Sequence, residues 1–336
     1  MAVESVEYVI VGGLREDYFI TPSGEAHLGK LGGNALYAAV GARLWTSGVG
    51  LIARVGTNFP AGWLDVIAAR GIDTGGVVVA PGPLDSRTFY AYRTLEQRED
   101  TDPAGHFARL GLPLPAALEG YTLSTLGQED PAVFGPLAVR PDEVATGYLG
   151  ARAFHLAPYD FSVHMTLPDR LRRGGRTLTC DPSVRYMHPD YAAEVRHLLS
   201  QLDAFLPSEM ETRAFFPDLV GNLWGAAEAF GSLGPGCVVL KLGARGQYVY
   251  VPASGRRWHV PAYPAHVVDV TGAGDAYCGG FLVGLDQTGD PLEAALRGCV
   301  AASLVVEGLG ALYALDQPRE RLTERLTELR QMVRPV

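Results

Sequence analysis

The segment 269–275 reads Asp-Val-Thr-Gly-Ala-Gly-Asp and places an acid directly after a glycine turn. An apolar, β-branched run ends at 267–268 and a small-residue segment follows over 276–285, so the pattern predicts a strand, a turn and a helix. A helix that begins at such a turn directs free backbone N–H groups and the positive end of its dipole toward an anion. Gly272 and Gly274 carry no Cβ atom that would keep a phosphate from the backbone.

Asp275 is unexpected beside such a turn, because a carboxylate would repel a resting phosphate. Its presence is explained if it takes a proton from a hydroxyl group that attacks the phosphate. The alternative is that Asp275 only offsets the helix dipole in the first helical turn. For one isolated Gly-x-Gly-Asp segment, both interpretations stay open.

The bulk composition indicates a globular, enzyme-sized chain. Its 336 residues are 47% apolar and 19% charged, which is ordinary for folded proteins. A net charge of −9 argues against nucleic acid or an anionic membrane surface as a partner. No apolar run approaches the roughly 18 residues expected of a membrane-spanning helix.

The cysteines and the first residues predict a cytoplasmic protein. Residues 1–4 lack the basic and then apolar pattern of a signal peptide. The four cysteines lie far apart without a Cys-x-x-Cys motif, which favours reduced, buried thiols over a disulfide or a metal site. They are Cys180, Cys237, Cys278 and Cys299.

Strand and helix signals alternate along most of the chain, which predicts an α/β fold with a largely parallel sheet and helices on its faces. The predicted strands are 8–11, 49–55, 77–80, 153–156, 177–180, 204–206 and 237–240. Predicted helices include 63–69, 191–202, 222–231 and 316–331. Residues 87–93 alternate like a strand that covers something on one face. Repeated prolines make 94–150 a loop-rich insertion or a substrate lid, more readily than a second domain.

Five ordered segments of this chain resemble the motifs of the ribokinase-like (PfkB-type) carbohydrate kinase family. The segments are 32–39 (Gly-Gly-Asn-Ala-Leu-Tyr-Ala-Ala), 55–62 (Val-Gly-Thr-Asn-Phe-Pro-Ala-Gly), 71–73 (Gly-Ile-Asp), 242–246 (Leu-Gly-Ala-Arg-Gly) and 269–275. Five matches in order are far more specific than any single one. The resemblance implies one ribokinase-like domain over 1–336, a three-layer α/β/α fold with a small β lid. It also implies phosphorylation of a sugar-like hydroxyl by ATP with Mg²⁺. We expect the lid to come from about 14–30 and 86–108.

The resemblance assigns roles to residues on the acceptor side. Asp275 would be the catalytic base, and the backbone of 272–274 (Gly272, Ala273 and Gly274) would hold the transferred phosphoryl group. Asp17, Gly33 and Asn34 would contact the sugar. Taken alone, Asp17 could equally be a turn aspartate and Asn34 a helix cap.

The resemblance also assigns residues to the nucleotide and to metal ions. Lys241, Gly243, Gly246 and Thr271 would border ATP, although an isolated Lys241 would more often be a solvated lysine at a strand end. Glu211 would help to order Mg²⁺, and Asp269 would lie near a monovalent cation such as K⁺ together with the loop 305–311.

Three residues depart from the family pattern. Ser208 and Ser183 stand where the family has asparagine, and a serine hydroxyl has a shorter reach and fewer donors than an amide. Arg15 stands where a ribose-type kinase would have a small amide. These departures put the substrate and the rate in doubt, but not the fold.

The acceptor stays open at this point. If Arg15, Arg87 and Arg185 converge, they would hold a carboxylate or phosphate, which predicts a sugar acid or phosphosugar. The aromatic residues Phe89, Tyr90 and Tyr92 would instead stack a base in a nucleoside kinase. Surface arginines and core aromatics are the plain alternatives for both sets.

Two other function classes are weaker. A non-catalytic relative that binds a nucleotide or sugar would explain the two lost asparagines, but not the retained Asp275. A dinucleotide oxidoreductase is disfavoured because 12–14 (Gly-Gly-Leu) lacks the Gly-x-Gly-x-x-Gly spacing. If the lid is a sheet edge, pairing of two lids would cover it, so a homodimer is a further expectation.

Overall fold

The computed structural model describes residues 5–95 and 97–335. Residues 1–4, whose pattern was weighed above as a possible signal peptide, lie outside the described residues. So do position 96 within the predicted lid segment 86–108 and the last residue of the predicted domain. Among the described helices, none is both long and apolar enough to cross a lipid bilayer.

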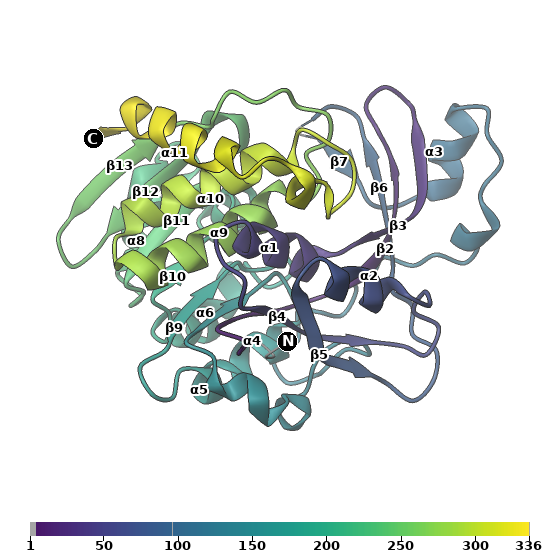
Figure 1. Ribbon diagram of the computed structural model, residues 1–336, viewed down its shortest axis with the longest axis horizontal. Helices are drawn as coiled ribbons and strands as arrows, with labels where there is room; N and C mark the ends of the chain where they lie inside the picture. Colours follow the sequence, from purple (N-terminus) through teal and green to yellow (C-terminus); the bar gives the residue numbers. More distant parts are fainter. Residues whose placement is uncertain (1–4, 96, 336) are drawn as a thin grey trace.

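A ten-stranded sheet forms the centre of the fold (Figure 1). Its strands from edge to edge are β14 (Arg334–Pro335), β13 (Arg256–Val260), β12 (Gln247–Val251), β11 (Cys237–Lys241), β10 (Ala204–Phe205), β9 (Thr177–Cys180), β8 (Ala153–Leu156), β1 (Tyr8–Val11), β4 (Val49–Val55) and β5 (Ile72–Val79). Neighbouring strands from β11 to β5 are parallel, and β11 to β14 are antiparallel. The mostly parallel sheet predicted from the sequence is therefore confirmed.

Helices cover both faces of this sheet, as the two-sided burial of β1 requires. Tyr8 and Ile10 of β1 belong to one apolar cluster, whereas Val9 and Val11 belong to another, because successive side chains of a strand point to opposite faces. The first face packs against α1 (Asn34–Arg43), α2 (Trp63–Ala69), α9 (Ala273–Thr288), α10 (Pro291–Val305) and α11 (Glu320–Met332). The second packs against α4 (Phe161–Thr166), α5 (Pro168–Leu171), α6 (Ala192–Leu199), α7 (Glu209–Phe215) and α8 (Leu223–Gly231). The result is the expected three-layer α/β/α arrangement.

Helices α1 and α9 pack with their backbones in contact because each helix has a glycine where it meets the other helix. A Cβ atom at Gly41 of α1 would lie 1.9 Å from the carbonyl oxygen of Ala276, and one at Gly279 of α9 would lie 1.8 Å from that of Ala38. Neither distance is sterically possible, so both positions need glycine at this separation. This packing brings the N-terminal ends of the two helices together.

A separate four-stranded sheet lies beside the main body (Figure 1). Its strands in order are β3 (Ala26–Gly32), β2 (Arg15–Ile20), β6 (Arg87–Tyr92) and β7 (Arg98–Glu99). One face buries Tyr18 and Phe89 against Phe107 of α3 (Pro103–Arg109). The segments 14–30 and 86–108 lie in and around this sheet, and its action as a lid stays a prediction.

The structure corrects the strand predicted to end at 267–268. Residues 261–270 contain no strand, and Val267 and Val268 are 39% and 40% exposed. The backbone N–H groups of Val268 and Asp269 instead donate to the carbonyl oxygen of Val306, at the end of α10. The β-branched residues suggested a strand, but this segment runs from β13 to the start of α9 without a neighbouring strand to pair with.

The loop-rich segment 94–150 contains little regular structure besides α3. Its other helical turns are the short 3₁₀ segments Ala116–Leu118, Pro141–Glu143 and Thr146–Gly150. Of these, the last buries Tyr148 in the second apolar cluster. The segment therefore covers parts of both the small sheet and the main sheet.

The α1–α9 contact yields a test of the fold. We expect Gly279→Ala to lower the free energy of unfolding by about 1–3 kcal/mol, because an added methyl group forces the two backbones apart. Urea unfolding followed by circular dichroism would measure the change. Gly147→Ala is the matched control, since nothing lies within 4 Å of the added methyl group. Equal stability of both variants would contradict the close packing.

Candidate functional site

The turn before α9 has the backbone that the sequence predicted. Gly272 adopts a left-handed conformation with a φ of 73° and is the N-cap of the sixteen-residue helix. A Cβ atom there would lie 2.0 Å from the Tyr37 ring, so that ring closes one side of the turn. Gly274 is exposed, and solvent reaches the turn from that side. The N–H group of Ala273 already donates to the carbonyl oxygen of Val270. The backbone N–H group of Gly274 is therefore more available to bind an anion.

Asp275 lies in the first turn of α9 and is half-buried. Burial raises its pKa from 3.8 to about 6, although the charges of Lys241 and Arg98 oppose this shift. A carboxyl group with such a pKa accepts protons more readily than an ordinary aspartate near neutral pH. Asp275 therefore has the properties of a general base.

Lys241 supplies a cation beside the same turn. It is the last residue of β11, and its Nζ lies within 3.7 Å of the position that a Cβ atom of Gly274 would occupy. The ammonium group forms an ion pair with Asp181, which directly follows β9. Burial disfavours the charged ammonium group, but the charge and hydrogen bond of Asp181, together with the charges of Cys278 and Glu211, outweigh this and raise the pKa of Lys241. Lys241 therefore stays positively charged where the helix dipole already favours an anion.

Parallel strands explain why these residues meet. Asp181 follows β9, Ser208 follows β10 and Lys241 ends β11, and carboxyl ends of parallel strands lie at one edge of a sheet. Ser208 forms a β-bridge with Lys241 and caps α7 through its hydroxyl group. Glu211 completes that cap by accepting from the backbone N–H of Ser208 at 2.8 Å. The serine in place of the family asparagine thus serves as a helix cap.

Asp17 and Arg15 of β2 face the site with unsatisfied polar atoms. Asp17 is 3% exposed, and its Oδ1 accepts no hydrogen bond within the described part of the chain. Nη1 of Arg15 is likewise buried without a partner among the described residues. Burial raises the pKa of Asp17 to about 7, against the opposing charge of Arg15. Buried polar atoms normally have partners, so this pair fits a polar ligand.

Gly33 and Asn34 hold the loops around Asp17 in place. Gly33 has a φ of 101°, and a Cβ atom there would lie 2.4 Å from the carbonyl oxygen of Gly13. The Asn34 amide accepts from the backbone N–H of Gly13 at 2.8 Å and donates to the carbonyl oxygen of Pro158. Asn34 therefore joins the ends of β1 and β8, and it is not the helix cap that the plain alternative predicted.

The small sheet contacts the α9 turn directly. The hydroxyl group of Tyr92 in β6 lies 2.8 Å from that of Thr271, which in turn donates to Asp269. The guanidinium group of Arg98 in β7 lies 4.3 Å from the centre of the Tyr90 ring. Arg98 is exposed to solvent, yet its charge lowers the pKa of both Asp17 and Asp275. The small sheet thus places a cation near both acids.

Known proteins resemble this chain in sequence and in structure. The model of the pfkB family carbohydrate kinases matches residues 164–318. Cytidine kinase of Thermococcus kodakarensis is 27% identical over 292 residues, which cover 87% of this chain and 92% of that protein. The 2-dehydro-3-deoxygluconokinase of Thermoproteus tenax is 29% identical over 287 residues, 80% of this chain and 77% of that protein.

A solved structure shares the fold. A ribokinase II of E. coli, in complex with ATP and Mg²⁺, superposes with a TM-score of 0.67 at 19% identity, covering 97% of this chain and 99% of that one. Residues 164–318 thus match the PfkB family of carbohydrate kinases, and two kinases resemble the chain over most of its length. The family resemblance seen in the sequence is confirmed, and with it the class of phosphotransferases.

Most residues of the two groups suggested for substrate binding have partners within the protein. Phe89 faces away, into the apolar cluster of the small sheet, because alternate residues of β6 point to opposite faces. Arg87 is bound by Asp85 and by the carbonyl oxygens of Ala117 and Glu119. Arg185 donates to Thr125 at 2.9 Å. Only Arg15 of the three arginines is left with a buried unpaired donor.

The remaining predicted residues have structural partners. Gly243 and Gly246 flank a 3₁₀ turn between β11 and β12, and Gly246 passes too close to Val260 to carry a side chain. Asp269 accepts from the backbone N–H of Thr271 at 2.9 Å. A direct role of these residues in binding ATP or a cation stays a prediction.

Arg98 and Asp181 were not predicted as site residues from the sequence. Arg98 lies on a strand of two residues inside the poorly readable segment, where no periodicity marks it. Asp181 begins an Asp-Pro pair directly after a predicted strand, which was a usable signal. Their electrostatic contact with Asp275 and Lys241 depends on the tertiary structure.

The buried ion pair yields a second prediction. We expect Asp181→Asn to lower the free energy of unfolding by about 3 kcal/mol, because it leaves the ammonium group of Lys241 buried without a counter-charge. Urea unfolding would measure the loss. Adding Lys241→Met should restore most of the stability, since neither partner is then charged. A double variant as unstable as the single variant would contradict this account.

Proposed function

We propose that this protein transfers the γ-phosphoryl group of ATP to a hydroxyl group of a sugar or sugar acid. The observation that carries the proposal is the position of Asp275, a half-buried acid with a raised pKa, beside Lys241 at the start of α9. A base and an anion-binding turn within one helical turn are what transfer to an alcohol requires. The alternatives within the family differ in the acceptor, and they share this chemistry.

In the proposed reaction, each residue acts on a defined group. Asp17 and Arg15 hold the acceptor through their unpaired Oδ1 and Nη1 atoms. Asp275 takes the proton of the attacking hydroxyl group. The backbone of 272–274 and the ammonium group of Lys241 stabilise the negative charge of the transferred phosphoryl group.

The carboxylates fit Mg²⁺ bound mainly through phosphate and water. No group of three metal-binding side chains occurs in residues 5–95 and 97–335. Mg²⁺ typically uses one or two carboxylates together with phosphate oxygens and water, and it neutralises phosphate charge when bound. The charge of Glu211 raises the pKa of Lys241 and of Asp275, which places Glu211 near both residues. Glu211 would contribute to Mg²⁺ binding through its second carboxylate oxygen. A K⁺ site near Asp269 would be tested by comparing activity in potassium and tetramethylammonium salts.

The acceptor we propose is a sugar acid, because a buried guanidinium nitrogen without a partner suits a carboxylate. The similarity to 2-dehydro-3-deoxygluconokinase supports this choice. A nucleoside is the second candidate, supported by the similarity to cytidine kinase. The contacts of the three aromatic residues argue against stacking of a nucleoside base. Phe89 is in the core of the small sheet, and Arg98 covers one face of the Tyr90 ring. The hydroxyl group of Tyr92 forms a hydrogen bond with that of Thr271.

The deciding experiment is a coupled assay of ADP release. The panel contains ribose, 2-dehydro-3-deoxygluconate and cytidine, each tested with wild-type protein and Arg15→Gln. For a sugar acid we expect kcat/KM of the variant to fall about tenfold or more, the effect of one hydrogen bond to a charged group. The decrease in kcat/KM of the variant should be smaller when ribose is the acceptor. Turnover of cytidine alone would favour the nucleoside kinase, and no ADP release with any acceptor would contradict the proposal.

We also propose that the protein forms a homodimer through a free edge of the small sheet. Its apolar face is already covered by α3 and Leu118, so only β3 or β7 offers unpaired backbone groups. Light scattering would measure the size, and a monomer would contradict this part of the proposal.

The base yields a third prediction. Asp275→Asn should lower kcat by about a hundredfold or more, because the amide cannot accept the proton. The Kd for ATP, measured by calorimetry, should stay within about threefold, since the N-terminus of α9 and Lys241 remain. Equal turnover of variant and wild type would remove Asp275 from the mechanism.

The raised pKa yields a fourth prediction, on pH. The pKa of Asp275 lies near 6, above the ordinary 3.8, so the carboxyl group becomes protonated and inactive as the pH falls through 6. We expect log kcat to decline by about one unit per pH unit below that value. Circular dichroism over the same range would confirm that the protein stays folded. Full activity down to about pH 4.5, where an ordinary aspartate is still ionised, would contradict the assignment.

A further inference from the structure

A buried hydrogen bond joins the small sheet to the turn before α9. The hydroxyl groups of Tyr92 and Thr271 lie 2.8 Å apart, and both residues are buried. Within the described part of the chain, this is the single hydrogen bond between a strand of the small sheet and the segment 269–275. The two parts of the candidate site are therefore linked at one defined point.

The direction of this bond follows from the other partners of Thr271. Its hydroxyl group donates to Oδ1 of Asp269 at 2.8 Å, and its backbone N–H group donates to the same oxygen at 2.9 Å. A hydroxyl group has one hydrogen atom, so the oxygen of Thr271 must accept from Tyr92. The hydrogen bonds therefore run from Tyr92 through Thr271 to the carboxylate of Asp269.

These bonds hold the backbone directly before the anion-binding turn. The N–H group of Asp269 donates to the carbonyl oxygen of Val306, at the end of α10. Thr271 precedes Gly272, whose φ of 73° begins the turn. Because Thr271 is held from both the small sheet and Asp269, fewer conformations are open to the turn. A segment that is already in its binding conformation loses less entropy when the ligand binds.

The strand that carries Tyr92 also faces the acceptor side of the site. Phe89 and Ala91 of β6 belong to the apolar cluster of the small sheet. Because alternate residues of a strand point to opposite faces, Thr88 and Tyr92 point the other way, toward the site. Thr88 pairs with Asp17 of β2 in the parallel ladder. Tyr92 therefore belongs to the same sheet as the proposed acceptor residues.

We propose that Tyr92 is a positioning residue for phosphoryl transfer. Its hydroxyl group holds Thr271, and through it the backbone of 272–274, in the conformation that binds a phosphate. When the small sheet moves away, this bond is lost and the turn populates conformations that bind the anion less well. The inference rests on the proposed function, because ATP supplies the phosphate at the turn.

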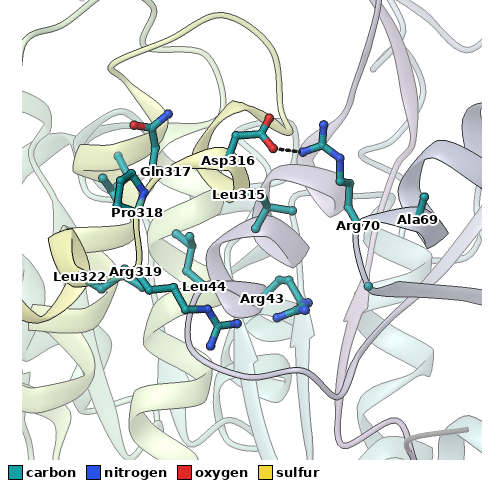
Figure 2. A pocket seen from close by; sticks show the side chains of 12 residues that line it. Arg43, Leu44, Ala69, Arg70, Leu315, Asp316, Gln317, Pro318, Arg319 and Leu322 are labelled. Atoms are coloured by element: carbon teal, nitrogen blue, oxygen red, sulfur yellow. Dashed lines mark hydrogen bonds and ion pairs between the residues drawn. The ribbon is translucent and has the colours of Figure 1, made fainter. Parts of the chain in front are cut away.

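The hollow shown in Figure 2 lies away from this hydrogen bond. Its lining includes the end of α1 and the segment leading into α11, where Asp316 accepts from Nη1 of Arg70 at 2.6 Å. Arg43 ends α1 at this hollow, whereas Asn34 begins that helix at the candidate site. The helix has 10 residues and is about 15 Å long. Loss of the Tyr92 hydroxyl group would therefore not change the affinity of a nucleotide bound there.

Calorimetric titration with Mg²⁺ and AMP-PNP, a non-hydrolysable ATP analogue, tests the proposal. We expect the Kd to rise about fivefold in Tyr92→Phe, the change in population that one hydrogen bond between neutral groups sustains. Tyr18→Phe is the matched control, because this buried tyrosine of β2 lies in the apolar cluster of the small sheet and its hydroxyl group bonds Glu16. It should leave the Kd unchanged. Circular dichroism would confirm that both variants are folded.

Two further variants test the route through Thr271. Thr271→Val removes the hydroxyl group that accepts from Tyr92, so adding Tyr92→Phe should then change the Kd less than about twofold. Thr271→Ser keeps the hydroxyl group, and adding Tyr92→Phe should again raise the Kd about fivefold. An equal rise in both backgrounds would mean that Tyr92 acts without Thr271, and it would overturn the proposal.

The outcomes separate this inference from the proposed function. The same Kd in the wild type, Tyr92→Phe and Tyr18→Phe would overturn the inference and leave the proposed reaction intact. A wild-type protein that does not bind the analogue would overturn both, because no nucleotide phosphate would then occupy the turn.

Discussion

The backbone contact between α1 and α9 is the constraint on which the rest of the site depends. Gly41 and Gly279 remove the side chains that would otherwise separate the two helices. The N-terminal ends of both helices then meet at the edge where the parallel strands end. One end carries Gly33 and the loops around Asp17, and the other carries the turn of Gly272. The distance between the loops around Asp17 and the turn of Gly272 is thus set by helix packing.

Several charged side chains with perturbed pKa values gather at this edge of the sheet. Asp17 and Asp181 are buried and Asp275 is half-buried, and burial raises the pKa of each. Lys241 and Arg98 supply the opposing charges from different sheets. An arrangement of buried acids with few counter-charges is costly for folding. It is typical of sites where ligands complete the charge balance.

The small sheet connects the two halves of the site. Tyr92 contacts Thr271 of the α9 turn, while Asp17 belongs to the neighbouring strand β2. A movement of this sheet would therefore change the acceptor side and the anion-binding turn together. Its outer apolar face is closed by α3, so the segment 94–150 contributes to the stability of the sheet.

The sequence alone predicted the resemblance to the PfkB family, the alternating α/β order and the glycine turn with Asp275, because these depend on neighbouring residues. Local sequence patterns gave wrong or incomplete predictions where the structure depends on residues that are far apart in the sequence. The β-branched residues at 267–268 suggested a strand, but strand formation needs a pairing partner that the tertiary structure does not provide there. Likewise, the residue types of β6 could not show that Phe89 faces the core while Tyr92 reaches Thr271.

Only the tertiary structure decided which charges meet. Asp181 and Lys241 are separated by 60 positions in sequence and become an ion pair because β9, β10 and β11 are parallel neighbours. The charge of Arg98 acts on Asp275 because the small sheet pairs β6 with β7. Electrostatic energy depends on distance in space, and chain packing fixes that distance for residues far apart in sequence.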